Sequence, residues 1–189
     1  MKTIKFFTLT VLLSSFFISC SKDKDEPQPE PKTVYVCQDT RYTGANCDQQ
    51  KTPKKVFLTK LVVTGFEQYK MAPNTPWDGC CDIGDGRPEL QLNVFAGTSS
   101  YRFGTNFLTD ANFNQRYEFV NGISSTLPIE LTDPDYGYYV RVSDVDAGAS
   151  NDIMADVHFT PYHSTNGFPN ILYVNTGNTT MEIHLSYEF

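Results

Sequence analysis

The last nine residues, MEIHLSYEF at positions 181–189, alternate apolar and polar side chains to the end of the chain. Successive side chains of a β-strand point to opposite faces of the sheet, so an alternation of period two places all the apolar ones on one face. The stretch is therefore predicted to be a half-buried strand, and its removal should cost the domain part of its core. Five apolar side chains form the buried face: Met181, Ile183, Leu185, Tyr187 and Phe189.

The same period recurs upstream, between clusters of turn-forming residues. Eight or so short strands in about 135 residues, with no convincing amphipathic helix, are typical of an antiparallel sandwich. We therefore expect an all-β fold, an antiparallel eight-stranded β-sandwich, over residues 54–189. The clearest alternating stretches are 56–63, 90–95, 138–142, 154–159 and 171–174.

The composition of the chain excludes some classes of function. The chain has 189 residues, is 40% apolar and 14% aromatic, and carries a formal net charge of −7. It is too apolar to be disordered. The acidic balance argues against a nucleic-acid partner, which would require a basic face, and against docking of the domain on anionic lipid headgroups.

The first 19 residues are predicted to be a signal peptide. Lys2 and Lys5 precede an apolar run over residues 6–17, which is too short to span a membrane. The run ends in FISC, which resembles a bacterial lipobox and implies that Cys20 is lipidated and becomes the N-terminus. An ordinary secretory peptide is the alternative.

Residues 20–36 are predicted to be a linker. The acidic stretch SKDKDE after Cys20 resembles the tag of surface lipoproteins in Bacteroidota-type bacteria, and alternating prolines follow it. Such a proline pattern gives an extended spacer. We therefore expect an outer-membrane protein that is held by its N-terminal lipid and faces the cell exterior.

If Cys20 carries a lipid, four cysteines remain. Outside the cytoplasm these can form disulfides, and four cysteines allow three pairings. Cys80 and Cys81 are adjacent, so an ordinary disulfide between them is disfavoured by the short distance between neighbouring Cα atoms. A strained vicinal disulfide, two free thiols, or bridges to Cys37 and Cys47 remain open.

The segment YTGANCD at 42–48 resembles the last loop of an epidermal-growth-factor-like module. That resemblance implies a disulfide between Cys37 and Cys47, and a small stapled loop over residues 37–53. The module's other cysteines are missing, so the resemblance covers a terminal fragment only.

Three aspartates at i, i+2 and i+8 form the strongest chemical signal: Asp144, Asp146 and Asp152. The first two share a face because they are two residues apart, and a turn at Gly148 can return the third towards them. Three carboxylates in one loop repel one another unless a cation lies among them or their pKa values rise. Calcium, which takes six to eight oxygen ligands in flexible geometry, suits such a loop.

This spacing resembles the third calcium loop of the C2 domain, an eight-stranded sandwich that binds calcium through its apical loops. The family's first calcium loop would correspond to the acidic segment before the strand at residue 90. The resemblance implies calcium as a cofactor and adds four candidate ligands: Asp78, Asp82, Asp85 and Glu89. The alternative is that these acids only form turns, as aspartate commonly does.

We find no catalytic motif, and no histidine has a partner motif, so we expect a non-catalytic, surface-exposed binding or adhesion protein with an unknown protein or glycan ligand. One alternative is a carbohydrate-binding module, and another is a structural subunit of an outer-membrane complex. The candidate sugar-stacking side chains are Trp77, Tyr101, Tyr117 and Tyr162.

Overall fold

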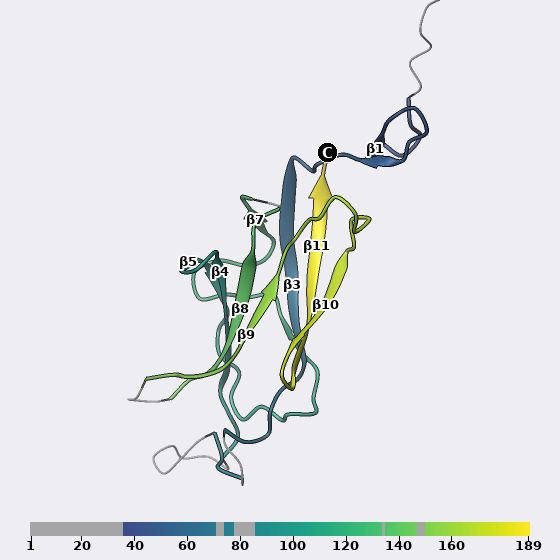
Figure 1. The fold of residues 1–189 in the computed structure, drawn as a ribbon. Coiled ribbons are helices and arrows are strands. Elements are labelled where there is room, and N and C mark those ends of the chain that lie inside the picture. The colour runs from purple at the N-terminus through teal and green to yellow at the C-terminus, as the bar shows by residue number, and fades with distance from the viewer. Residues whose placement is uncertain (1–35, 71–73, 78–85, 134, 147–149) are drawn as a thin grey trace, which may run out of the picture. The chain divides into compact units, whose positions relative to one another are not determined.

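The computed structural model describes residues 36–70, 74–77, 86–133, 135–146 and 150–189. All regular structure in these ranges is β-strand, joined into antiparallel sheets, which confirms the predicted all-β fold (Figure 1). No membrane-spanning helix is found in these ranges.

The first layer of the sandwich is built around its first long strand, β3 (Lys55–Gly65), which lies beside the C-terminal strand β11 (Thr179–Glu188). β10 (Ile171–Thr176) is the hairpin partner of β11. On the other side of β3, β6 (Tyr117–Phe119) pairs with its second half and β7 (Ile129–Leu131) with its first half. The two short strands thus share one edge, and this layer has four strand positions.

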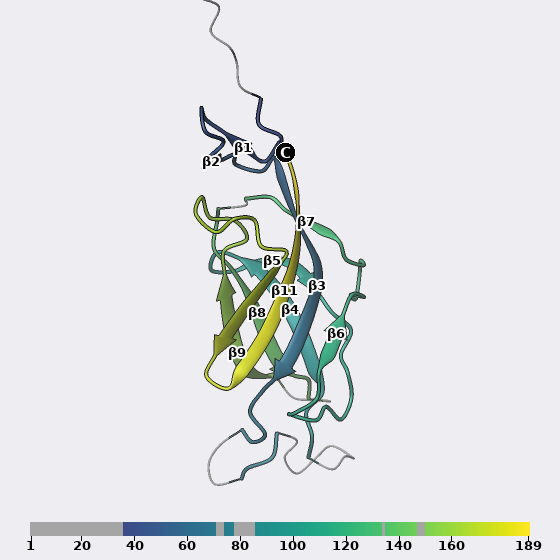
Figure 2. The same cartoon turned by 90° about the vertical axis from the view of Figure 1, so that its right-hand side faces the viewer.

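The second layer has the order β5-β4-β8-β9. Its strands are β4 (Leu90–Ala96), β5 (Ser100–Gly104), β8 (Tyr138–Asp144) and β9 (Asp152–Phe159). Each layer has four strand positions, so the sandwich has the eight strand positions that the sequence predicted. Figure 2 shows the two layers packed face to face.

The core lies between the layers and largely follows the alternation in the sequence, although a register shift in β3 after Leu58 moves the next core position to Leu61. Val56, Leu58 and Leu61 of β3 and Ile183 of β11 have no exposed surface, and they face Leu92 and its neighbours in the second layer. Burying each such side chain contributes about 1.5–3 kcal/mol relative to leaving it in water. The predicted role of the C-terminal strand is confirmed for its first three apolar positions, whereas Tyr187 and Phe189 are half-buried at the end of the sandwich.

The chain enters the sandwich at one end and carries its acidic loops at the other. Lys55 at the start of β3 is paired with Glu188, next to the C-terminus, and Figure 1 shows the start of β3 beside that terminus. β8 ends and β9 begins at the opposite end of the sandwich, as Figure 1 shows, and the last residue of β8, Asp144, pairs with the first of β9, Asp152.

A stapled loop precedes the sandwich. Cys37 is bonded to Cys47, with their Cα atoms 5.6 Å apart, and β1 (Tyr42–Thr43) pairs with β2 (Gln49–Gln50) within the loop. Tyr42 packs edge-on against Phe168, with ring centroids 5.8 Å apart. The disulfide that the growth-factor-like resemblance implied is thus present, and an aromatic contact joins the loop to the entry end of the sandwich.

Candidate functional site

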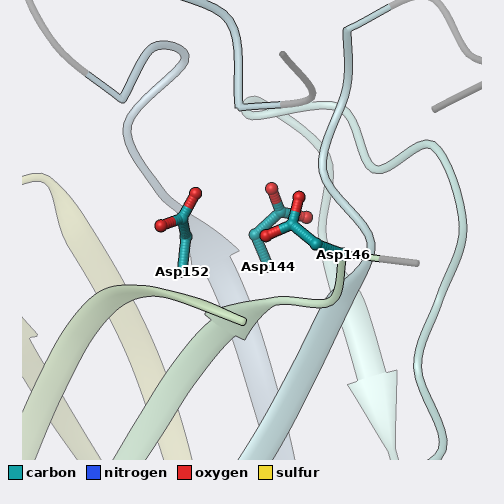
Figure 3. Close-up of side chains that lie close together, drawn as sticks. All are labelled: Asp144, Asp146 and Asp152. Carbon is teal, nitrogen blue, oxygen red and sulfur yellow. The ribbon is translucent and has the colours of Figure 1, made fainter. Parts of the chain in front are cut away.

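The three aspartates of the predicted calcium loop converge where β8 ends and β9 begins. One potential ligand oxygen from each of Asp144, Asp146 and Asp152 lies within 4.8 Å of the other two. Figure 3 shows the three carboxylates rising from the two strand ends to the same side. The pairing of β8 with β9 makes this possible, because it brings Asp152 directly opposite Asp144 in the sheet.

Asp144 is the fixed member of this acidic cluster. It is fully buried, at the last position of β8, between Leu90 of β4 and Asp152 of β9. Its Oδ1 accepts a hydrogen bond of 2.8 Å from the backbone N–H of Glu89, whose carbonyl in turn accepts one from the N–H of Val145. These two bonds hold the carboxylate in place before any ion arrives, so a ligand would find part of its site already ordered.

The spacing of the oxygens suits a single divalent ion. Calcium binds oxygen at about 2.3–2.6 Å, so two oxygens on one ion lie at most about 5 Å apart. Two carboxylates at that separation repel by about 3 kcal/mol at an effective dielectric constant of about 20. Like charges that lie directly opposite each other in a sheet destabilise it. Asp144 and Asp152 form such a pair, so their negative charges would destabilise the sheet unless a positive charge lay nearby. The cluster can therefore hold a metal ion, and it gains stability from any nearby positive charge.

A lysine of the protein itself carries a positive charge beside the cluster. The Nζ of Lys70 donates a hydrogen bond to Oδ2 of Asp152. This bond raises the pKa of the Lys70 ammonium above its usual value, and the charges of Asp152, Asp146 and Asp144 add to the rise. Lys70 thus lies within the electrostatic field of all three carboxylates. A cation bound by the cluster would compete with the Lys70 ammonium for the Asp152 carboxylate.

Local contacts present Lys70 to the cluster. The segment that follows β3 folds back on itself, because the N–H of Lys70 bonds to the carbonyl of Thr75 and the indole N–H of Trp77 bonds to that of Glu67. Trp77 is buried and anchors this turn. Our sequence analysis missed Lys70, although one signal existed: it is the only basic residue between positions 61 and 86, a range rich in acids.

The remaining candidate ligands divide into two groups. Glu89 adjoins the cluster and holds Asp144 through its main chain, a role that the sequence did not indicate. The other predicted ligands and the adjacent cysteines lie outside the described residues: Asp78, Asp82, Asp85, Cys80 and Cys81. The lipidation candidate Cys20 also lies outside them.

The four aromatic residues suggested as a sugar platform do not share one surface. Trp77 and Tyr162 are buried, with 6% and 4% of their surface exposed, and Tyr162 stacks on Phe168. Tyr117 accepts a hydrogen bond from the N–H of Asn112. Of the four, Tyr101 has a largely exposed ring, 55% of its surface, and it lies on the outer face of the second layer.

Fold and site together define an antiparallel β-sandwich with a carboxylate cluster at the end opposite its N-terminal entry. No family model matches the sequence, and no curated protein matches it. Among solved structures, human GIVD cytosolic phospholipase A2 in complex with methyl gamma-linolenyl fluorophosphonate is similar over 73% of this chain, with a TM-score of 0.42 and 12% identity. The matched region is 18% of that protein's chain, and a likeness this distant carries no conclusion about function.

Proposed function

We propose that this protein is a lipid-anchored, non-catalytic binding protein of the outer surface whose C2-like sandwich binds calcium at its distal end. The observation that carries the proposal is the convergence of Asp144, Asp146 and Asp152. Two carboxylates on one strand end and a third on the next supply hard oxygen ligands on a rigid scaffold, which is the chemistry that calcium prefers.

The position of the cluster supports a role at a distance from the membrane. A lipid on Cys20 and the proline-containing linker would attach to the end of the sandwich where β3 begins. Asp144 and Asp152 lie at the other end of the strands. A calcium ion there would order the distal loops, where an adhesion partner can reach them.

Calorimetric titration of the mature chain with calcium chloride, after treatment with a chelator, tests the metal claim. We expect a saturable binding event, with weaker binding of magnesium because magnesium demands nearly octahedral geometry and gives up its water reluctantly. An absence of calcium binding would remove the proposed function and leave the acids as turn formers that are neutralised by Lys70.

Replacing Lys70 with methionine is expected to tighten calcium binding, because the ion no longer displaces an ammonium group from Asp152. The ion pair is partly exposed, so the gain should be modest, roughly two- to fivefold in Kd. Lys70→Arg should bind calcium like the wild type. Lys55→Met is the matched control, because it removes an exposed ion pair with Glu130 at the other end of β3; an equal gain in this variant would contradict the role of Lys70.

The anchor is tested by cell fractionation. Wild-type protein is expected in the outer-membrane fraction and at the surface, where added protease reaches it. Cys20→Ser should leave the membrane fraction, because it lacks the thiol that would carry the lipid. Membrane association of Cys20→Ser equal to that of the wild type would refute the lipid anchor without affecting the calcium claim.

A further inference from the structure

An aromatic row crosses the outer face of the second layer. Tyr101, Phe95, Tyr139 and His158 lie on β5, β4, β8 and β9, and each is paired in the sheet with the next. Phe95 and Tyr139 stack with centroids 4.9 Å apart, while Tyr101 and His158 pack at the two ends of this pair at 5.8 and 5.4 Å. The end members, Tyr101 and His158, are exposed.

A polar row runs beside the aromatic row, two residues away along β4, β8 and β9 and three residues away along β5, where the register shifts. It consists of Gly104, Asn93, Arg141 and Asp156, again paired from strand to strand. Arg141 makes two hydrogen bonds of 2.8 Å to the Asp156 carboxylate, and its guanidinium lies 5.7 Å from the ring centres of both Phe95 and Tyr139. The aromatic stack thus fixes the charged pair, which stays about one-third exposed.

Gly104 leaves room in the polar row for groups from its neighbours. A Cβ at this position would lie 2.5 Å from the Tyr101 hydroxyl and 2.5 Å from Oδ1 of Asn93. Both polar groups therefore lie over the glycine, next to Arg141. The result is a surface on which ring edges, a hydroxyl, an amide and a charged pair are held by one sheet.

We propose that these two rows form a binding surface for a neutral polysaccharide. A sugar chain presents apolar C–H faces and rows of hydroxyl groups. The exposed Tyr101 ring can stack on a C–H face, while the Arg141–Asp156 pair and Asn93 offer donors and acceptors to adjacent hydroxyls.

Charge and size favour a neutral glycan over other occupants. The two rows carry one positive and one negative group, already bound to each other, so they offer no attraction to a polyanion. They cross four strands, roughly 14 Å, and two residue positions, so their area is on the order of 200 Å². A stable protein–protein contact takes about 800 Å² from each partner.

The surface is separate from the acidic cluster. Arg141, the member of the surface that comes nearest to Asp144 on β8, precedes it by three residues, which is roughly 10 Å along an extended strand, and Tyr139 precedes it by five residues. Glycan binding is therefore expected to persist when calcium is removed by a chelator, so the two proposals can fail independently.

Affinity electrophoresis of the mature chain in gels containing xylan, α-mannan, amylose or mixed-linkage β-glucan tests this proposal, with polygalacturonate as the anionic comparison. We expect retardation by at least one neutral polymer. Tyr101→Ala should weaken that binding roughly tenfold or more, as the loss of an exposed aromatic anchor does. Tyr173→Ala, which removes an exposed tyrosine from β10 in the other layer, should bind like the wild type.

Arg141→Gln is a second variant, which changes the polar row instead of the aromatic row. The melting temperatures of Arg141→Gln and Tyr101→Ala are both compared with that of the wild type, to show whether each variant is folded. Loss of binding in both variants at an unchanged melting temperature would support the surface. The proposal is overturned if no neutral polymer retards the wild type, if polygalacturonate alone does so, or if both variants bind as well as the wild type does.

Discussion

Replacing Asp144 with alanine is expected to abolish the rise in melting temperature that calcium gives the wild-type protein. Calcium at one hundred times its Kd should stabilise the wild type by about 2.7 kcal/mol. For a domain of this size that corresponds to a shift of roughly 5–10 °C. The variant loses the ligand that is buried and held by the N–H of Glu89, so thermal unfolding with calcium and with chelator should coincide.

Two further variants make this result interpretable. Asp144→Asn keeps an oxygen for the Glu89 N–H but loses the charge, so it should fold more like the wild type and still lack most of the calcium shift. Asp133→Ala is the control, because Asp133 lies in the turn that precedes β8, at the end of that strand opposite Asp144. A calcium shift that survives in both Asp144 variants would exclude this cluster as the metal site.

Replacing Ile183 with alanine is expected to lower the free energy of unfolding by about 3–4 kcal/mol, the largest loss we predict for a single core position. Ile183 has no exposed surface and lies on β11 between Leu172 of β10 and Leu61 of β3. Truncation of a buried aliphatic side chain removes its transfer free energy and leaves a cavity. Chemical denaturation of the two proteins measures the difference.

The control for Ile183 comes from the same strand. Ser186 is exposed, and Ser186→Ala should change the free energy of unfolding by no more than about 0.5 kcal/mol. Equal losses in the two variants would show that β11 does not contribute to the core as described. Deletion of residues 179–189 should prevent folding altogether, because β3 would lose its long neighbour and β10 its hairpin partner.

Several long strands could be predicted from the sequence, because their side chains alternate between a buried face and a more exposed one, as in β4 and β11. β8 departs from this pattern, with buried side chains at six of its seven positions. The stretches at 90–95 and 171–174, for example, became β4 and β10 with small extensions. The short strands β6 and β7 gave no such signal. A segment of three residues is too short to show an alternating pattern. These segments form strands because they can pair with the free edge of β3.

The site was predictable in part for a similar reason. Asp144, Asp146 and Asp152 are close in sequence, so a hairpin suffices to bring them together. Lys70 and Glu89 reach the same place from other loops, and their contacts depend on how β3, β4 and β8 are stacked across two layers. The exposed face with Tyr101 and Arg141 likewise depends on four strands being aligned in register.

By itself, the sequence determined the all-β class, the apolar face of the alternating strands such as β4 and β11, and the closeness of three acids around one chain reversal. These are local consequences of side-chain alternation and of the pairing of adjacent strands. Tertiary structure alone decided which strands are neighbours, that a lysine meets the aspartates, and that aromatic and polar rows share a surface. Such features join residues that are far apart in the sequence, as Lys70 and Asp152 are at a separation of 82 positions, and only the packing of the two layers specifies these contacts.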